Sequence, residues 1–114
     1  MLSKRNRLTK SEFENIFKKG GVLHSPFFIL RYIKNNKKSN YAISVVVPKK
    51  VSKKAADRNK IRRRYYYILK KIEPKIDNKL NAVLIIKKTT QKDVYSDTEK
   101  AVIEFFLKNG LMRR

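Results

Sequence analysis

Three stretches of the chain carry apolar residues at helical spacing. The first begins with Thr9-Lys10-Ser11-Glu12, which has the form of a capping box, and it ends at Gly20-Gly21. The second covers residues 53–72. The third begins at another capping box, Ser96-Asp97-Thr98-Glu99, and ends at Asn109-Gly110. The pattern therefore predicts three helices separated by segments of a different kind.

The same spacing predicts which side of each helix faces the core. In the second helix Ser52 is the expected N-cap, and the apolar positions recur every three or four residues. The residues expected to face inward are Phe13, Ile16 and Phe17, then Ile61, Tyr65, Ile68, Leu69 and Ile72, and finally Ala101, Val102, Phe105 and Phe106.

Unbroken apolar runs between the helices predict strands. Residues 22–34 and 41–47 are rich in β-branched and aromatic residues, and the polar turn 35–40 joins them, so we expect an antiparallel hairpin. Residues 82–86 read as a short strand buried on both faces, and a further short strand fits at 22–24. The order is then α-β-β-(β)-α-β-α, an α+β arrangement of one sheet covered by helices.

The net charge of the chain indicates that the protein binds a charged partner. The 114 residues include 30 Lys and Arg against nine Asp and Glu, a formal net charge of +21. Residues 48–75 alone hold twelve basic and two acidic residues. So many positive charges repel one another in the folded state, and binding to a polyanion would reduce this repulsion. Its concentration in a quarter of the chain argues for a binding face.

Other compositional features narrow the function classes. The absence of cysteine excludes disulfides and thiolate metal sites and fits a reducing cytoplasm. Met1-Leu2 runs directly into basic residues, and the longest apolar runs are too short to span a bilayer, so we expect no signal peptide and no membrane. With one histidine, no glycine-rich phosphate loop and no acidic cluster, we expect no catalytic residue and no directly bound metal.

A basic face is predicted on the side of the second helix away from its apolar stripe. Its members lie within an arc of about 100°. They are Asn59, Arg62, Arg63, Tyr66 and Lys70. Arginine presents a planar fork that matches phosphate and also stacks on bases, and asparagine can contact a phosphate or the hydration shell of a metal. A merely solvated helix is less favoured because residues 58–72 contain no acidic residue.

The segment Arg58-Asn59-Lys60-Ile61-Arg62-Arg63 resembles the RNR-type signature of the bacterial ribonuclease P protein component. The resemblance covers nearly the whole chain, because four further segments occur in the family's order and spacing. They are Arg5-Asn6-Arg7-Leu8, Phe13 and Phe17 with Lys18-Lys19-Gly20, Ile43 to Val47 with Lys49-Lys50-Val51, and Ala82 to Ile86. Each motif alone is weak, whereas their combination is specific.

The resemblance implies a single α/β sandwich domain over residues 1–114, with a left-handed β-α-β crossover, and a role in binding RNA. It implies the protein subunit of ribonuclease P, a ribonucleoprotein endoribonuclease of the cytoplasm that matures the 5′ end of tRNA. The subunit would bind the catalytic RNA and the 5′ leader of precursor tRNA and support Mg²⁺-dependent removal of the leader. The RNA would carry the chemistry and bind most of the Mg²⁺.

Site residues follow from the resemblance and from the basic face. Those expected to contact the catalytic RNA are Lys49, Lys50, Lys53, Arg58, Asn59, Lys60, Arg62, Arg63, Tyr66 and Lys70. Those expected in a leader cleft are Phe13, Phe17 and Arg31. Asn59 is expected to reach Mg²⁺ only through the hydration shell of an RNA-bound ion. Two positions depart from the family: Tyr66 stands where a third arginine is usual, and Arg31 where an aromatic residue is common.

Two other classes remain open on these residues. A ribosomal or other structured-RNA-binding protein could use the same basic helix with no role in cleavage. An architectural DNA-binding protein would instead bind duplex DNA and structured RNA comparably. The first class is separated from the ribonuclease P subunit by whether cleavage of precursor tRNA by a matched catalytic RNA at low Mg²⁺ depends on this protein.

Overall fold

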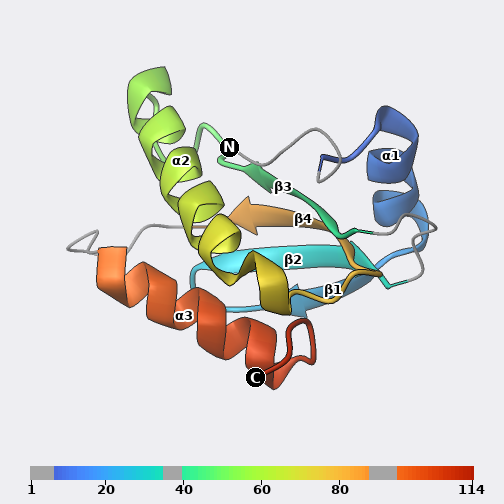
Figure 1. Ribbon diagram of the computed structural model, residues 1–114. Coiled ribbons are helices and arrows are strands. Elements are labelled where there is room, and N and C mark those ends of the chain that lie inside the picture. Colours follow the sequence, from blue (N-terminus) through green and yellow to red (C-terminus); the bar gives the residue numbers. More distant parts are fainter. Residues whose placement is uncertain (1–6, 35–39, 88–94) are drawn as a thin grey trace.

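The protein has a four-stranded mixed sheet flanked by three helices (Figure 1). A computed structural model describes residues 7–34, 40–87 and 95–114. The elements in chain order are α1 (Lys10–Lys19), β1 (Gly21–His24), β2 (Phe28–Ile33), β3 (Ala42–Val46), α2 (Ala55–Ile72), the short 3₁₀ helix η2 (Glu73–Lys75), β4 (Asn81–Ile86) and α3 (Tyr95–Lys108). The predicted α+β order, with the additional short strand near residues 22–24, is confirmed.

The predicted pairing of the two long strands is wrong. The sheet order is β1-β2-β4-β3, so β4 lies between β2 and β3. β4 pairs antiparallel with β2 and parallel with β3. A strand that is apolar on both faces gains most from a central position, where neighbours on both sides take its hydrogen bonds. β2 was predicted to pair with the run at 41–47, but it pairs with β1 and β4. The run at 41–47 forms β3, which pairs with β4.

The apolar run at 22–34 folds back on itself as a hairpin of β1 and β2. Pro26 cannot donate a backbone hydrogen bond, and it interrupts the run. Ser25 holds the turn from both sides: its backbone N–H donates to the Phe28 carbonyl over 2.9 Å, and its hydroxyl accepts from the Phe27 N–H over 3.2 Å. The one predicted strand is therefore two.

β3, α2 and β4 form a β-α-β unit, because β3 and β4 are parallel neighbours and α2 connects them. In Figure 1 α2 lies in front of the sheet, β3 and β4 both run toward the left, and β4 lies below β3. A chain that follows this path turns with a left hand, against the usual right-handed rule. The crossover that the family resemblance implies is present.

The core lies between the sheet and the pair α2 and α3. It includes the whole predicted stripe of α2, together with Val102, Phe105 and Phe106 of α3, all buried. α1 packs on the opposite face, where Ile16 is fully buried and the Asn81 side-chain amide donates to the Glu12 carboxylate over 3.5 Å. Among the described residues, α1 is the helix that covers this face.

Helix starts agree with the sequence in one case of three. The capping box at Thr9 and Glu12 is formed, with both reciprocal hydrogen bonds present. Ser52 is not the N-cap of α2: the helix begins at Ala55, and Ser52 instead donates its hydroxyl to Asp57 over 3.4 Å. α3 begins at Tyr95, so the predicted cap Ser96 lies inside its first turn.

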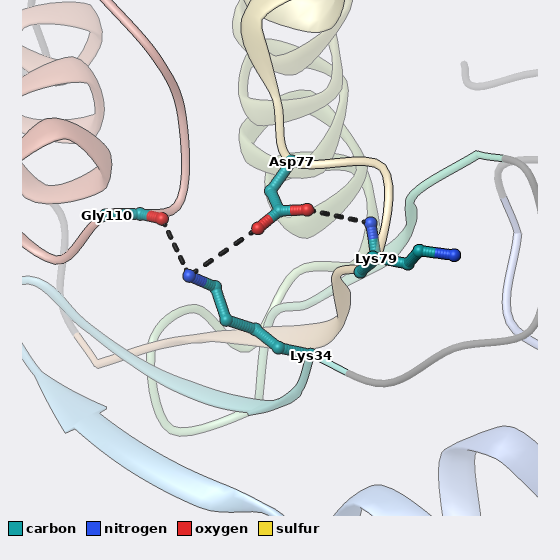
Figure 2. Close-up of polar contacts among 4 residues, drawn as sticks. All are labelled: Lys34, Asp77, Lys79 and Gly110. Carbon is teal, nitrogen blue, oxygen red and sulfur yellow. Dashed lines mark hydrogen bonds and ion pairs between the residues drawn. The ribbon is translucent and has the colours of Figure 1, made fainter.

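Lys34, at the end of β2, connects three segments that lie far apart in sequence. Its ammonium donates to the Gly110 carbonyl over 2.8 Å and pairs with the Asp77 carboxylate at 3.5 Å (Figure 2). Asp77 also accepts from the Lys79 N–H over 2.9 Å. Gly110 has a φ of 68°, a conformation that glycine adopts without strain, so the predicted end of the third helix is confirmed.

Candidate nucleic-acid interface

The exposed side of α2 holds three polar residues of the predicted basic face close together. Asn59 and Arg63 are exposed, and Arg62 is half-buried. The Arg62 guanidinium donates to the Asn59 side-chain oxygen over 2.6 Å. Together with Ala56 and Tyr66 they line a surface hollow of about 540 Å³. The helical spacing thus brings these residues together as predicted.

Tyr66 is placed differently from the rest of the predicted face. It is half-buried and packs against the core, and its hydroxyl accepts a hydrogen bond of 2.9 Å from the Val45 N–H. Val45 belongs to β3, which is an edge strand. Tyr66 therefore lies at the boundary between the basic face and the core, where α2 contacts the edge strand β3. The basic face as a whole does not point directly away from the core.

Lys70, the last member of the predicted face, forms an ion pair with Glu73, which also binds the side chain of the buried Tyr41. Its ammonium lies 3.5 Å from the Glu73 carboxylate, which accepts the Tyr41 hydroxyl over 2.8 Å. Burial and the Glu73 carboxylate both raise the pKa of the Tyr41 hydroxyl. The charge of Lys70 is thus partly balanced before any partner binds.

The remaining residues expected to contact the catalytic RNA divide into two groups. Lys49, Lys50 and Lys53 are exposed in the segment that enters α2, and Lys60 is exposed on the helix. Arg58 is half-buried, and its guanidinium donates to the carbonyls of Ser52 and Lys53 over 3.0 and 2.9 Å. Arg58 therefore holds the segment before α2 in place, a role that residue spacing alone does not indicate.

The three residues of the predicted leader cleft lie together on the α1 side of the sheet. The rings of Phe13 and Phe17 are 5.0 Å apart, centroid to centroid. The Arg31 guanidinium carbon lies 4.8 Å from the centroid of the Phe17 ring, within the range of a cation–π contact. Phe17 is 41% exposed and Phe13 is half-buried, so neither is a buried core residue as the helical stripe predicted.

The sheet beside this stack offers further surface that the sequence did not single out. Val22, Arg31, Val83 and Ser44 lie in one row across the four strands, and Ile29, Ile85 and Val46 lie in a second row on the same face. Val22 is 40% exposed, and the three residues of the second row are half-buried. Strand alternation could have identified them, once the strand order was known.

The described residues form neither a metal-binding cluster nor a helix that could span a membrane. Within ranges 7–34, 40–87 and 95–114, no group of three or more His, Cys, Asp or Glu could hold a metal ion. In the same part of the chain, no helix has the length and apolar character that crossing a membrane requires.

The fold and the composition define a small, strongly basic α+β protein whose parallel β-α-β unit carries an arginine-rich helix. The model of one protein family, Ribonuclease P, matches residues 2–110. The ribonuclease P protein component of Syntrophomonas wolfei is 31% identical over 115 residues, which cover 100% of this chain and 95% of that protein. The component of Desulfosudis oleivorans is 34% identical over 108 residues, which cover 94% of this chain and 88% of that protein.

Solved structures agree with this match. A mutant of the Staphylococcus aureus RNase P protein superposes with a TM-score of 0.83 at 21% identity, covering 96% of this chain and 92% of that one. The RNase P protein from Thermotoga maritima superposes with a TM-score of 0.73 at 24% identity, covering 86% of this chain and 92% of that one. At these identities the structures show the fold alone.

The chain belongs to the ribonuclease P protein family, as the sequence resemblance predicted. The family provides the protein component of a tRNA-processing ribonucleoprotein, and its general function is to bind RNA and take part in processing precursor tRNA. An RNA subunit and precursor tRNA are the partners that this membership implies.

Proposed function

We propose that this protein is the non-catalytic subunit of ribonuclease P, which binds the catalytic RNA through α2 and the 5′ leader of precursor tRNA through the α1 side of the sheet. In this role it supports Mg²⁺-dependent endonucleolytic removal of the leader, which the RNA performs. The proposal places the protein in the cytoplasm, together with the RNA partner that the family implies.

The single observation that carries this proposal is the cluster on α2. Asn59, Arg62 and Arg63 come together on an accessible surface, in a chain that matches the family over residues 2–110. Arginine forks suit phosphate oxygens, and phosphate contacts supply most of the affinity of proteins for nucleic acids. The exposed Lys49, Lys50, Lys53 and Lys60 extend the same surface.

The leader part of the proposal rests on the stack of Arg31, Phe17 and Phe13. Single-stranded RNA is commonly bound by aromatic rings and guanidinium planes on which bases stack. The stack lies next to the half-buried apolar residues of β2, β3 and β4, so a strand of RNA would meet planar and apolar surface together.

Magnesium is assigned mainly to the RNA. The described residues supply no acidic or imidazole cluster for it, and Asn59 is neutral, so this chain fits the ion only through a water of its hydration shell. Bound there, Mg²⁺ would supply charge stabilisation for phosphodiester cleavage. The part of this chain would be to orient Asn59, which the Arg62 side chain holds by its hydrogen bond.

The experiment is precursor tRNA cleavage with the catalytic RNA of the same organism, this protein, or both, at low and high Mg²⁺. We expect no cleavage by protein alone, and cleavage at low Mg²⁺ only when both are present. Lys108→Ala, an exposed lysine in the last turn of α3, is the matched control for Arg62→Ala and Arg63→Ala.

Two outcomes would contradict the proposal. One is cleavage by highly purified protein that a point mutation abolishes, which would make the protein itself catalytic. The other is cleavage at low Mg²⁺ that is the same with and without the protein, which would favour a structured-RNA-binding protein with no role in cleavage.

A further inference from the structure

The hollow beside α2 combines two kinds of surface. Arg62, Arg63 and Asn59 contribute polar groups, whereas Ala56 contributes a methyl group and Tyr66 an aromatic ring. Its volume of about 540 Å³ falls within the range of roughly 300–1,000 Å³ typical of small-molecule sites. A surface that served only to attract phosphate would need the cations but not the ring.

The side chains around the hollow are held in position before any partner binds. The Tyr66 hydroxyl is fixed by the Val45 N–H, and its ring packs against the core. The Arg62 guanidinium is fixed by Asn59 over 2.6 Å. A ring that is anchored at its hydroxyl and supported by the core loses little freedom when another planar group contacts it, which favours binding.

We propose that this hollow receives one unstacked nucleobase of the bound RNA, stacked against the Tyr66 ring, while Arg62 and Arg63 contact the neighbouring phosphates. The inference rests on the proposed function of α2 and gives it a ligand: an unpaired nucleotide in place of a uniform phosphate backbone. Unstacked bases are recognised in this way, on aromatic rings and beside guanidinium groups.

Tyr67 provides a matched comparison within the same helix. It is also a tyrosine and is 66% exposed, but it does not line the hollow. If any accessible aromatic ring could stack on RNA, Tyr67 would contribute as much as Tyr66. If the hollow is the site, only Tyr66 contributes.

The test compares two short RNAs of equal length and charge, a single-stranded hexamer and the same hexamer without bases. Binding is followed at the side-chain amide resonance of Asn59, because Asn59 lines this hollow and is present in every variant. We expect the wild-type protein to bind the intact hexamer about tenfold more tightly, since one base–aromatic stack contributes that order of affinity.

Substitutions then assign the preference to the ring. Tyr66→Leu is expected to remove the tenfold preference and leave binding of the baseless RNA unchanged. Tyr66→Phe, which keeps the ring and loses only the hydroxyl, is expected to retain the preference, and Tyr67→Leu to leave it unaltered. Melting temperatures check that each variant folds.

Equal binding of the two hexamers by the wild-type protein would overturn the inference, even if Tyr66→Leu did not fold. Loss of the preference in Tyr67→Leu to the same degree as in Tyr66→Leu would overturn it as well. The proposed function fails separately, if Arg62→Ala and Arg63→Ala bind the catalytic RNA as the wild type does.

Discussion

Arginines of this chain take different roles according to what lies next to each guanidinium. Arg58 donates to two backbone carbonyls and so belongs to the fold. Arg62 donates to Asn59 on the exposed side of α2, and Arg31 lies over the ring of Phe17 on the other side of the sheet. Only the neighbours distinguish a structural arginine from one that is available to a phosphate.

Arg31 is predicted to contribute to leader binding. Arg31→Ala should weaken binding of precursor tRNA with a long leader roughly fivefold, since one charge-assisted contact contributes about 1 kcal/mol. Binding of a substrate with almost no leader should be unchanged, and Arg31→Tyr should restore part of the loss through stacking. If both variants bind both substrates like the wild type, Arg31 serves only its contact with Phe17 and takes no part in leader binding.

Asn59→Ala is predicted to raise the Mg²⁺ concentration needed for half-maximal cleavage more than it weakens RNA affinity. The amide would order waters around an RNA-bound ion, a contribution that a saturating ion concentration can replace. Asn59→Asp is the control, because it keeps an oxygen to accept the Arg62 hydrogen bond. An unchanged Mg²⁺ profile with a large loss of affinity would show that Asn59 contacts the RNA directly.

At the scale of elements, one side of α2 packs in the core and another carries the proposed RNA-binding residues. Its inward stripe is buried against the sheet, and its exposed side carries Asn59 and Arg63. On a third side Lys71 pairs with Glu99 of α3 at 3.0 Å. Substitutions on different sides of one helix should therefore change different properties.

Arg62→Ala and Arg63→Ala are predicted to weaken binding of the catalytic RNA and to lower the log–log salt slope by about one unit each. Their unfolding free energy should change by no more than about 0.5 kcal/mol, because no buried group loses a partner. Lys71→Ala should show the reverse pattern: a stability loss of up to ~1 kcal/mol from the ion pair with Glu99 and unaltered RNA affinity. Unfolding of either arginine variant would show that the binding face is misassigned.

The end of α3 allows a test of stability alone. Gly110→Ala should cost about 1–2 kcal/mol, because the left-handed conformation strains a residue with a Cβ atom. The space itself is open, since the added carbon would lie 3.9 Å from the Lys34 ammonium. Thermal unfolding should report a loss several-fold smaller for Gly110→Asn, which tolerates this conformation. Equal melting temperatures for all three proteins would contradict the backbone explanation.

At the scale of the whole molecule, the charge of +21 is unevenly distributed over the fold. The segment that holds about half of it, residues 48–75, includes α2 and the turn before it, along one edge of the sheet beside β3. The opposite edge, β1, carries Val22 and His24 but no charged lysine or arginine. A polyanion is therefore expected to approach from the α2 edge.

The salt dependence of RNA binding measures this charge directly. We predict a log–log slope of about −4 or steeper, the value for roughly six phosphate contacts of a single-stranded kind. The measurement is affinity for the catalytic RNA across a series of monovalent salt concentrations at fixed Mg²⁺. A slope near zero would remove the electrostatic basis of the binding face.

Much of the fold and of the site could be predicted from the sequence, because local spacing determines them. The inward stripe of α2, the capping box at Thr9 and the cluster of Asn59, Arg62 and Arg63 each depend on residues within a few turns of one another. Helical periodicity is enough to place such residues on one face. The family resemblance followed from the same short segments and their order.

Only the tertiary structure decided which strands pair and what surrounds each polar side chain. The residues of the apolar run at 82–86 do not indicate which strands pair with it. It lies between β2 and β3, because a strand buried on both faces gains the most contacts in a central position. The anchoring of Tyr66 by Val45 and the position of Arg31 over Phe17 join residues far apart in the chain. Such contacts depend on packing between elements, which local spacing does not determine.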